Sequence, residues 1–174
     1  MPIHRSIALL LTLAASVLVS SANVLAEPLQ QTAQCPVASN DVMSAALGAP
    51  AQLLDPDFGV TVNGSDTECL FSAGGQMVLV RRTAEYFVSS QATPDSIEQL
   101  RQLVADDLDY VPVSGVGNAA FWATVHDRSL APERMGVLIS QQGADALAIG
   151  VMDTPEALAT ATALTQAVVA AQAP

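Results

Sequence analysis

Residues 135–152 read MGVLISQQGADALAIGVM, and this stretch decides the fold class of the chain. Two strand-like apolar runs, Met135 to Ser140 and Ala144 to Met152, flank the triplet Gln141-Gln142-Gly143. Strand-like runs that are separated by a short link containing glycine are typical of a β-hairpin. Strands joined by hairpins pair antiparallel, so the stretch predicts an antiparallel sheet.

A helix start follows the hairpin and has a counterpart earlier in the chain. Thr154-Pro155-Glu156 places a capping residue, a proline and an acid at the beginning of a helix, and Thr93-Pro94-Asp95 repeats this arrangement. The earlier helix is expected to run to about Leu108. The residues expected on the inner faces are Ile97, Leu100, Leu103, Val104 and Leu108 in the earlier helix, and Leu158, Ala161, Leu164, Thr165, Val168 and Val169 in the later one.

The remaining elements complete a repeated order. A short helix is expected over Asp41 to Leu47, where Ser39 or Asn40 caps it and Gly48 ends it. Further strands are expected over 59–62, 68–72, 76–82 and 119–125, with a short extended piece over 110–113. The order is helix, β-meander, helix, β-meander, helix, which fits an internal duplication or a coincidence of common caps. We therefore predict an α+β domain with a mainly antiparallel sheet of about five to six strands and three helices packed on it.

The first 26 residues have the order of a secretory signal peptide. A basic start at Met1–Arg5 precedes an apolar run over Ile7–Val19 and small residues that end at Ala26. The alternative is an uncleaved anchor, but a spanning helix needs about 20 apolar residues and this run is shorter. We predict cleavage after Ala26, a flexible tail over 27–34 and one domain over 35–172. The protein is then periplasmic or extracellular, without a stable membrane anchor.

Cys35 and Cys69 are the two cysteines of the chain. In an oxidising compartment such a pair predicts one disulfide, which is worth roughly 3.5–4 kcal/mol in the chain-entropy model for a loop of this length. A catalytic or metal-binding thiol pair is the alternative, and it would require a closer spacing such as C-x-x-C. Lipidation of Cys35 is not expected, because Gln34 is too large for the position that precedes a lipid-modified cysteine.

The charge of the chain limits its partners. The net charge is −11, and removal of Arg5 with the signal peptide leaves five arginines against 17 acidic residues, a charge of −12 with no lysine. Such an acidic chain is repelled by nucleic acids and by anionic membrane surfaces, so nucleic acid is excluded as a partner. The acidity is typical of a soluble surface, and a cationic partner is the alternative.

Two motifs resemble cofactor or metal sites without meeting their requirements. The segment from Gly115 to Ala120, GVGNAA, matches the loose dinucleotide pattern G-x-G-x-x-A, but a strand is expected after it instead of the helix that holds a pyrophosphate. Asp106, Asp107 and Asp109 lack the glycine and the distal glutamate of a calcium loop. We therefore expect no cofactor and no metal.

One histidine remains after the signal peptide. His126 precedes Asp127, but a Ser-His-Asp triad needs residues that converge in space, and the chain contains no G-x-S-x-G motif. No catalytic residue is assigned, and a hydrolase that uses His126 stays an alternative function.

The candidate ligand-binding residues are Arg81, Arg82, Tyr86 and Trp122. Tyr86 and Phe87 are adjacent and would point to opposite faces of a strand, which leaves one ring exposed. An exposed aromatic ring beside arginines supplies stacking and charge together.

Several short motifs together resemble one family. They are Cys35-Pro-Val, the segment VMSAALG over 42–48, Glu68-Cys-Leu-Phe71, and VGNAAFW over 116–122. The pattern resembles the secreted actinobacterial lipoproteins grouped as domain of unknown function 3558 and spans most of residues 35–171. The resemblance implies an α+β domain with bridged cysteines, and it carries no catalytic residue. The chain departs from the family in lacking a lipobox.

Together these observations favour an exported, non-enzymatic domain that binds an unknown small ligand or an envelope protein. The alternatives are the hydrolase that uses His126 and a structural, envelope-associated protein. A concave pocket with Arg81 or Arg82 at its mouth would favour binding. His126 within hydrogen-bond reach of a serine in a cleft would favour catalysis.

Overall fold

The structure is a computed structural model that describes residues 34–54, 60–103, 108–125 and 135–173. These residues all belong to one compact unit, Thr32–Pro174. The predicted signal peptide and its cleavage site lie outside the described residues, as do His126 and Asp127. Among the helices in the described ranges, none is long and apolar enough to cross a membrane.

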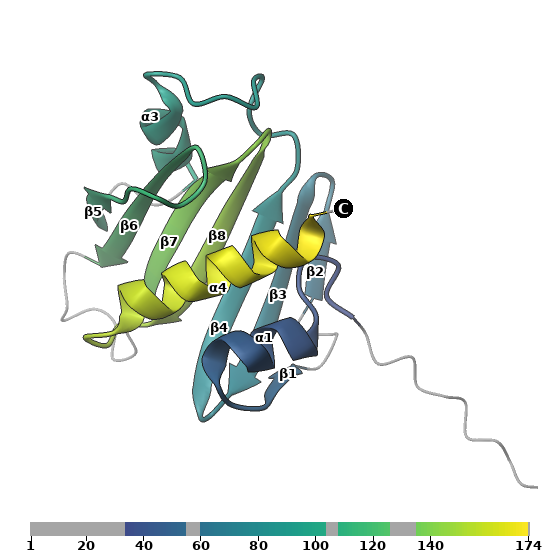
Figure 1. The fold of residues 1–174 in the computed structure, drawn as a ribbon. Coiled ribbons are helices and arrows are strands. Elements are labelled where there is room, and N and C mark those ends of the chain that lie inside the picture. Colours follow the sequence, from purple (N-terminus) through teal and green to yellow (C-terminus); the bar gives the residue numbers. More distant parts are fainter. Residues whose placement is uncertain (1–33, 55–59, 104–107, 126–134, 174) are drawn as a thin grey trace, which may run out of the picture. The chain divides into compact units, whose positions relative to one another are not determined.

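A single antiparallel sheet organises the unit (Figure 1). The strands in the described residues are β1 (Ala51–Leu53), β2 (Val60–Asn63), β3 (Asp66–Ala73), β4 (Gln76–Thr83), β5 (Leu108–Pro112), β6 (Ala119–Val125), β7 (Met135–Gln142) and β8 (Asp145–Met152). Seven of them follow the order β1-β3-β4-β8-β7-β6-β5, and β2 pairs with β3 off this path. The predicted α+β class and antiparallel sheet are confirmed, but the predicted five to six strands are too few.

The predicted strand count omits β1 and includes β5 only as a short extended piece over 110–113. β1 has three residues, too few to show an alternation, and it pairs with the end of β3 through Ala51 opposite Ala73. β5 begins at Leu108, which also fits the apolar spacing of the preceding helix. The chain instead pairs Leu108 with Val125 of β6, so the backbone groups of this segment are satisfied by a strand ladder.

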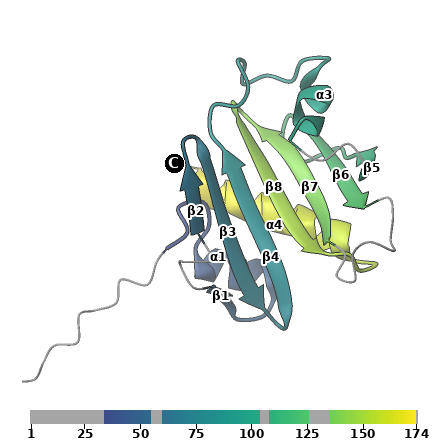
Figure 2. The same ribbon diagram turned by 180° about the vertical axis from the view of Figure 1, so that it is seen from behind.

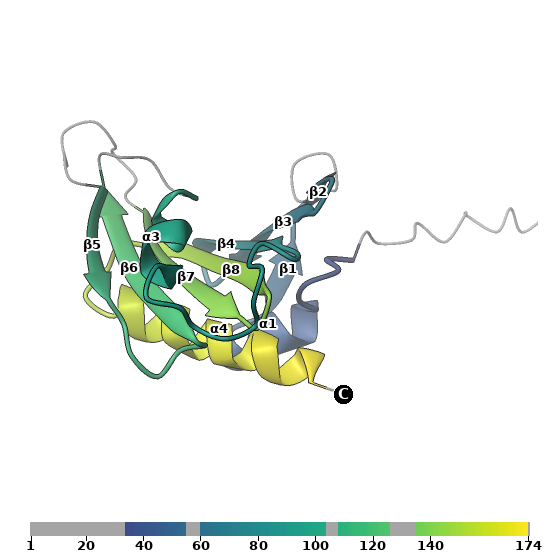
Figure 3. The same cartoon turned by 90° about the horizontal axis from the view of Figure 1, so that it is seen from above.

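The register of the sheet separates its side chains into two faces. One row across the strands consists of Cys69, Val80, Ile149, Leu138 and Trp122, and it lies on the face that α1 and α4 cover. The neighbouring row consists of Glu68, Arg81, Ala148, Ile139 and Phe121, and it lies on the opposite face, which carries α3. Figure 3 shows α1 and α4 on one side of the sheet and α3 on the other.

Helices α1 (Asn40–Leu47) and α4 (Ala157–Gln172) pack together on the first face. Ser39 caps α1 by accepting a hydrogen bond from the Val42 N–H at 3.2 Å, and Gly48 ends it in the left-handed conformation at φ 65°. The residues of α4 that are buried are Ala157, Ala161, Leu164, Thr165 and Val168. Most of the predicted inner face is therefore confirmed, whereas Leu158 is 38% exposed.

Helix α3 (Ser96–Arg101) is much shorter than predicted. The threonine and proline of the repeated start form a turn before the helix, since the Thr93 carbonyl accepts from the Ser96 N–H at 3.0 Å, and the Thr154 carbonyl accepts from the Ala157 N–H in the same way. Leu100 of α3 is fully buried against Phe121 and Ile139. The expected continuation to Leu108 is wrong, because Leu108 belongs to β5.

The predicted cysteine pair is present in the structure. Cys35 and Cys69 are bonded, and their Cα atoms lie 5.9 Å apart. Cys69 is fully buried in the face beneath α1 and α4. The pair thereby fastens the segment that enters the unit to the middle of β3. At the other end of the chain, the Gln172 side chain donates to the Val37 carbonyl at 2.8 Å.

Candidate functional site

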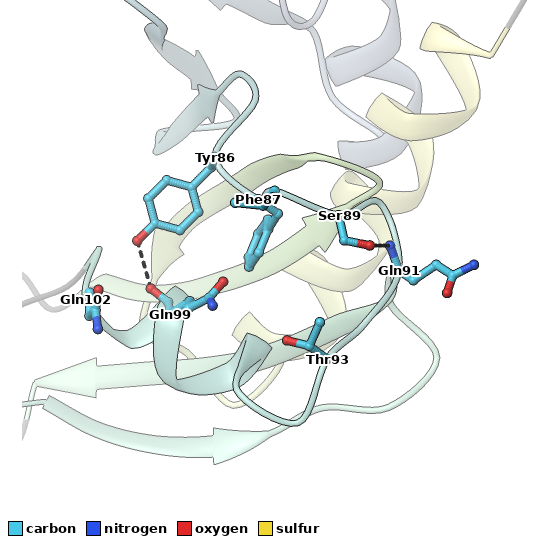
Figure 4. A pocket seen from close by; sticks show the side chains of 8 residues that line it. Tyr86, Phe87, Ser89, Gln91, Thr93, Gln99 and Gln102 are labelled. Atoms are coloured by element: carbon cyan, nitrogen blue, oxygen red, sulfur yellow. Dashed lines mark hydrogen bonds between the residues drawn. The ribbon is translucent and has the colours of Figure 1, made fainter.

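Two hollows on the α3 side of the sheet are candidate binding sites. The first, which we call the loop pocket, has a volume of about 510 Å³ and lies between the segment that follows β4 and helix α3 (Figure 4). Its lining residues are Tyr86, Phe87, Val88, Ser89, Gln91, Thr93, Gln99 and Gln102. Amides, hydroxyls and aromatic rings therefore make up most of its surface.

The segment after β4 is held to the β7–β8 turn at two points. Glu85 adopts a left-handed backbone conformation with φ 53°, and its N–H donates to Asp145 Oδ1 at 2.8 Å. The Phe87 N–H donates to the Ala144 carbonyl at 2.8 Å, and the Phe87 ring is buried in the core beneath α3. Left-handed backbone is costly for a residue other than glycine, and the Asp145 contact offsets that cost.

Gln141 supports the same segment from inside the sheet. Its side chain is fully buried, and its Nε2 donates to the carbonyls of Ser89 at 3.1 Å, Gln91 at 3.3 Å and Gly143 at 3.1 Å. Its Oε1 has no hydrogen-bond partner among the described residues. The sequence pattern assigned Gln141 only to a hairpin link. Its contact with Gln91 joins residues 50 positions apart, so no local sequence pattern could reveal this supporting role.

The loop pocket carries no formal charge at neutral pH. Tyr86 is the titratable residue among those that line it. The Tyr86 hydroxyl donates to the Gln99 carbonyl at 2.9 Å, as Figure 4 shows, and burial raises the pKa of Tyr86 above its ordinary value. The Tyr86 and Phe87 rings meet edge to face with centroids 5.1 Å apart. The Tyr86 and Phe87 rings thus form an aromatic wall of the pocket, beside neutral side chains that can form hydrogen bonds.

The second hollow, which we call the strand hollow, has a volume of about 160 Å³ and lies over β4, β7 and β8. Its apolar lining is formed by Leu79, Leu103, Val137, Ile139, Ala146 and Ala148. Its polar lining is formed by Glu68, Arg81 and Thr83. It is therefore an apolar depression with a charged edge.

The charged edge of the strand hollow is organised around Asp66. Arg81 NH2 donates to Asp66 Oδ2 at 2.8 Å. A hydrogen bond from Thr83 and then the Arg81 guanidinium hold the pKa of Asp66 below its ordinary value, against the opposing effect of burial. Glu68 lies directly opposite Arg81 in the β3–β4 register, and in the described part of the chain it forms no ion pair.

The structure does not bring the four predicted ligand-binding residues together. Tyr86 lines the loop pocket and Arg81 lines the strand hollow. Arg82 lines neither of these hollows. Its Nε instead donates to Asp145 Oδ2 at 2.8 Å. Trp122 lies on the other face of the sheet, where its ring packs on Gly136 so closely that a Cβ there would meet a ring carbon at 1.9 Å.

The glycine-rich segment forms a turn between two strands. Gly115 and Gly117 have φ values of 78° and 60°, and β6 begins two residues later at Ala119. A strand follows this turn, as the sequence predicts. A Cβ on Gly117 would lie 2.2 Å from the Gln141 carbonyl, so close packing against β7 explains the glycine.

Two groups of candidate residues fall outside the described ranges. His126 and Asp127 are among them, so the hydrolase hypothesis stays a prediction, and so are Asp106 and Asp107 of the acidic group. A comparison of the chain with protein-family models, curated proteins and solved structures finds no match. Function is therefore inferred from the two hollows.

Proposed function

We propose that the chain is an exported, non-enzymatic binding domain and that the loop pocket is its ligand site. The observation that carries the proposal is a pocket of about 510 Å³ that is lined by neutral hydrogen-bonding side chains beside an aromatic wall. Small-molecule sites commonly measure about 300–1,000 Å³ and place a few polar groups beside aromatic ones. Arg81 lines the separate strand hollow, so the expected arginine at the mouth of the site is not part of this proposal.

The lining favours a neutral ligand that is rich in hydroxyl or amide groups. Glutamine amides and threonine hydroxyls can both donate and accept hydrogen bonds. Gln99, Gln102 and Thr93 can therefore form hydrogen bonds with the hydroxyl or amide groups of such a ligand. A charged ligand would lose its hydration without meeting an opposite charge among the lining residues. The Tyr86 ring offers an apolar surface to the ligand's carbon skeleton.

The same lining supports binding over catalysis. A nucleophilic hydroxyl needs a base within hydrogen-bond reach. Ser89 Oγ accepts from the Gln91 N–H at 3.2 Å, and Thr93 Oγ1 lies 3.2 Å from Ser96 Oγ. Among the lining residues there is no histidine or carboxylate that would act as the base.

Export is part of the proposal. The order of charged, apolar and small residues before Glu27 is that of a signal peptide, and the Cys35–Cys69 pair suits an oxidising compartment. The proposed location is the periplasm or the extracellular medium.

The proposal is tested with three sugars that share one ring size and differ in charge. Protein exported from the full chain is titrated with N-acetylglucosamine, glucosamine and glucuronate, and side-chain amide signals are followed by NMR. We expect the neutral sugar to shift the Gln99 and Gln102 amide signals most, because the pocket has no charge to compensate the other two. Gln102→Leu should weaken this binding, and Gln76→Leu, at the exposed first residue of β4, is the matched control. Shifts confined to other residues, or an equal response of both variants, would refute the assignment.

A further inference from the structure

The strand hollow has the size and the edge of a second binding site, separate from the loop pocket. We propose that it binds a small organic cation, an amine that carries an apolar group about the size of a benzene ring. None of the residues that line the strand hollow lines the loop pocket. The proposal therefore stands whether or not the loop pocket binds a neutral ligand.

The hollow arises from the sizes of neighbouring side chains on the α3 face. Ala146, Ala148 and Gly150 follow one another along this face of β8. Larger residues flank them in register, with Arg81 and Ile139 on either side of Ala148. Small residues between larger ones leave a trough in the sheet surface. Leu103, which follows α3, also lines the hollow.

The apolar part of the hollow fits a single ring. Its volume is about 160 Å³, and a protein cavity of about 150 Å³ lined by aliphatic and aromatic side chains binds benzene. Five of its apolar lining residues come from the sheet, which is held by continuous ladders between β4, β8 and β7. Because β8 is paired with β4 over six residues and with β7 over eight, the site is preorganised and a ligand need not order it.

The charged edge selects a cation. Asp66, Glu68 and Arg81 contribute two negative charges and one positive charge, and Arg81 is already bonded to Asp66 at 2.8 Å. The Glu68 carboxylate is left as the half-buried charge at the edge of an apolar surface. An ammonium group beside Glu68 would gain a charge-assisted hydrogen bond while its apolar group fills the hollow. The chain's net charge of −11 also attracts cations and repels anions.

The test uses three probes of nearly equal size that differ in charge: benzylamine, benzyl alcohol and benzoate. Methyl signals of the apolar lining residues are followed by NMR in the exported protein at low salt. We expect benzylamine to bind about two- to fivefold more tightly than benzyl alcohol, the range of a partly exposed ion pair, and benzoate to bind most weakly. This preference should shrink in high salt, which screens partly exposed charges.

Two variants separate the charge from the cavity. Glu68→Gln should bind benzyl alcohol unchanged and lose the preference for benzylamine, whereas Glu156→Gln, at an exposed carboxylate before α4, should keep it. Ala148→Leu should reduce the binding of all three probes by filling the trough. Equal binding of the three probes, a preference for benzoate, methyl shifts confined to other residues or an unaltered preference in Glu68→Gln would each overturn the proposal.

Discussion

Gln141→Leu should separate the stability of the sheet from the order of the loop pocket. In the native protein, the Gln141 Nε2 reaches three carbonyls at 3.1–3.3 Å, two of which belong to Ser89 and Gln91 in the pocket segment. An amide nitrogen has two hydrogens, so two of these contacts are full hydrogen bonds at one time. Leucine has nearly the same size, so the change removes the hydrogen bonds without leaving a cavity.

The expected change in the free energy of unfolding is small because two effects oppose each other. Two hydrogen bonds contribute about 1–3 kcal/mol in total. The Gln141 Oε1 is buried and has no partner among the described residues, and its removal recovers about 1–3 kcal/mol of desolvation cost. The two effects should therefore cancel to within about 1 kcal/mol in the free energy of unfolding, measured in urea. The carbonyls of Ser89 and Gln91, in contrast, lose their hydrogen bonds to the Gln141 side chain.

The decisive assay is native-state hydrogen exchange of segment 86–93. Its protection should fall far more than the global stability does, because two of the three carbonyls that the Gln141 amide holds belong to this segment and the third belongs to the β7–β8 turn. Ligand binding to the loop pocket should weaken in parallel. Gln142→Leu is the matched control, since the Gln142 amide donates to Ser140 Oγ at 2.8 Å and contacts no carbonyl of the segment. Equal protection of segment 86–93 in the two variants would refute the positioning role of Gln141.

Three further predictions follow from the charges and the cysteine pair. Ligand binding to the loop pocket should not change between about pH 5 and 9, because Tyr86 is its titratable lining residue and its pKa is raised; a bell-shaped titration by calorimetry would contradict this. Replacing Cys35 and Cys69 with alanine should lower the free energy of unfolding by about 3–4 kcal/mol in urea, and an unchanged midpoint would contradict an intact bond. The pKa of Asp66 is lowered, so its contribution to stability is complete above the unfolded value and disappears as the pH falls through the folded value. The stability difference between the native protein and Asp66→Asn should therefore be largest near neutral pH and vanish in strong acid, and a difference that grows in acid would contradict the shift.

Much of the sheet could be predicted because its signals are local. Alternation along the chain places Val78 and Val80 on one face of β4 and Leu79 and Arg81 on the other, as observed. The glycine links between strands each need a backbone conformation that other residues rarely adopt, and Gly143 has φ 63°. Short-range patterns of this kind do not depend on which strands become neighbours.

The candidate sites could not be predicted in the same way, since they depend on long-range pairing. The strand hollow exists because β4 pairs with β8, which places Arg81 opposite Ala148. Nothing near either residue in the chain specifies that pairing. The sequence therefore identified Arg81 and Tyr86 as candidates but did not show that they serve separate hollows.

The short length of α3 connects the two hollows. A helix over 93–108 would measure about 24 Å, whereas the six residues of α3 measure about 9 Å. Figure 2 shows β3 and β4 facing the viewer with α4 behind them and α3 beside β6 and β7. Because the helix ends at Arg101, Leu103 borders the strand hollow and Gln102 remains at the loop pocket. The early end of α3 therefore leaves the two residues that follow it, Gln102 and Leu103, to line different hollows.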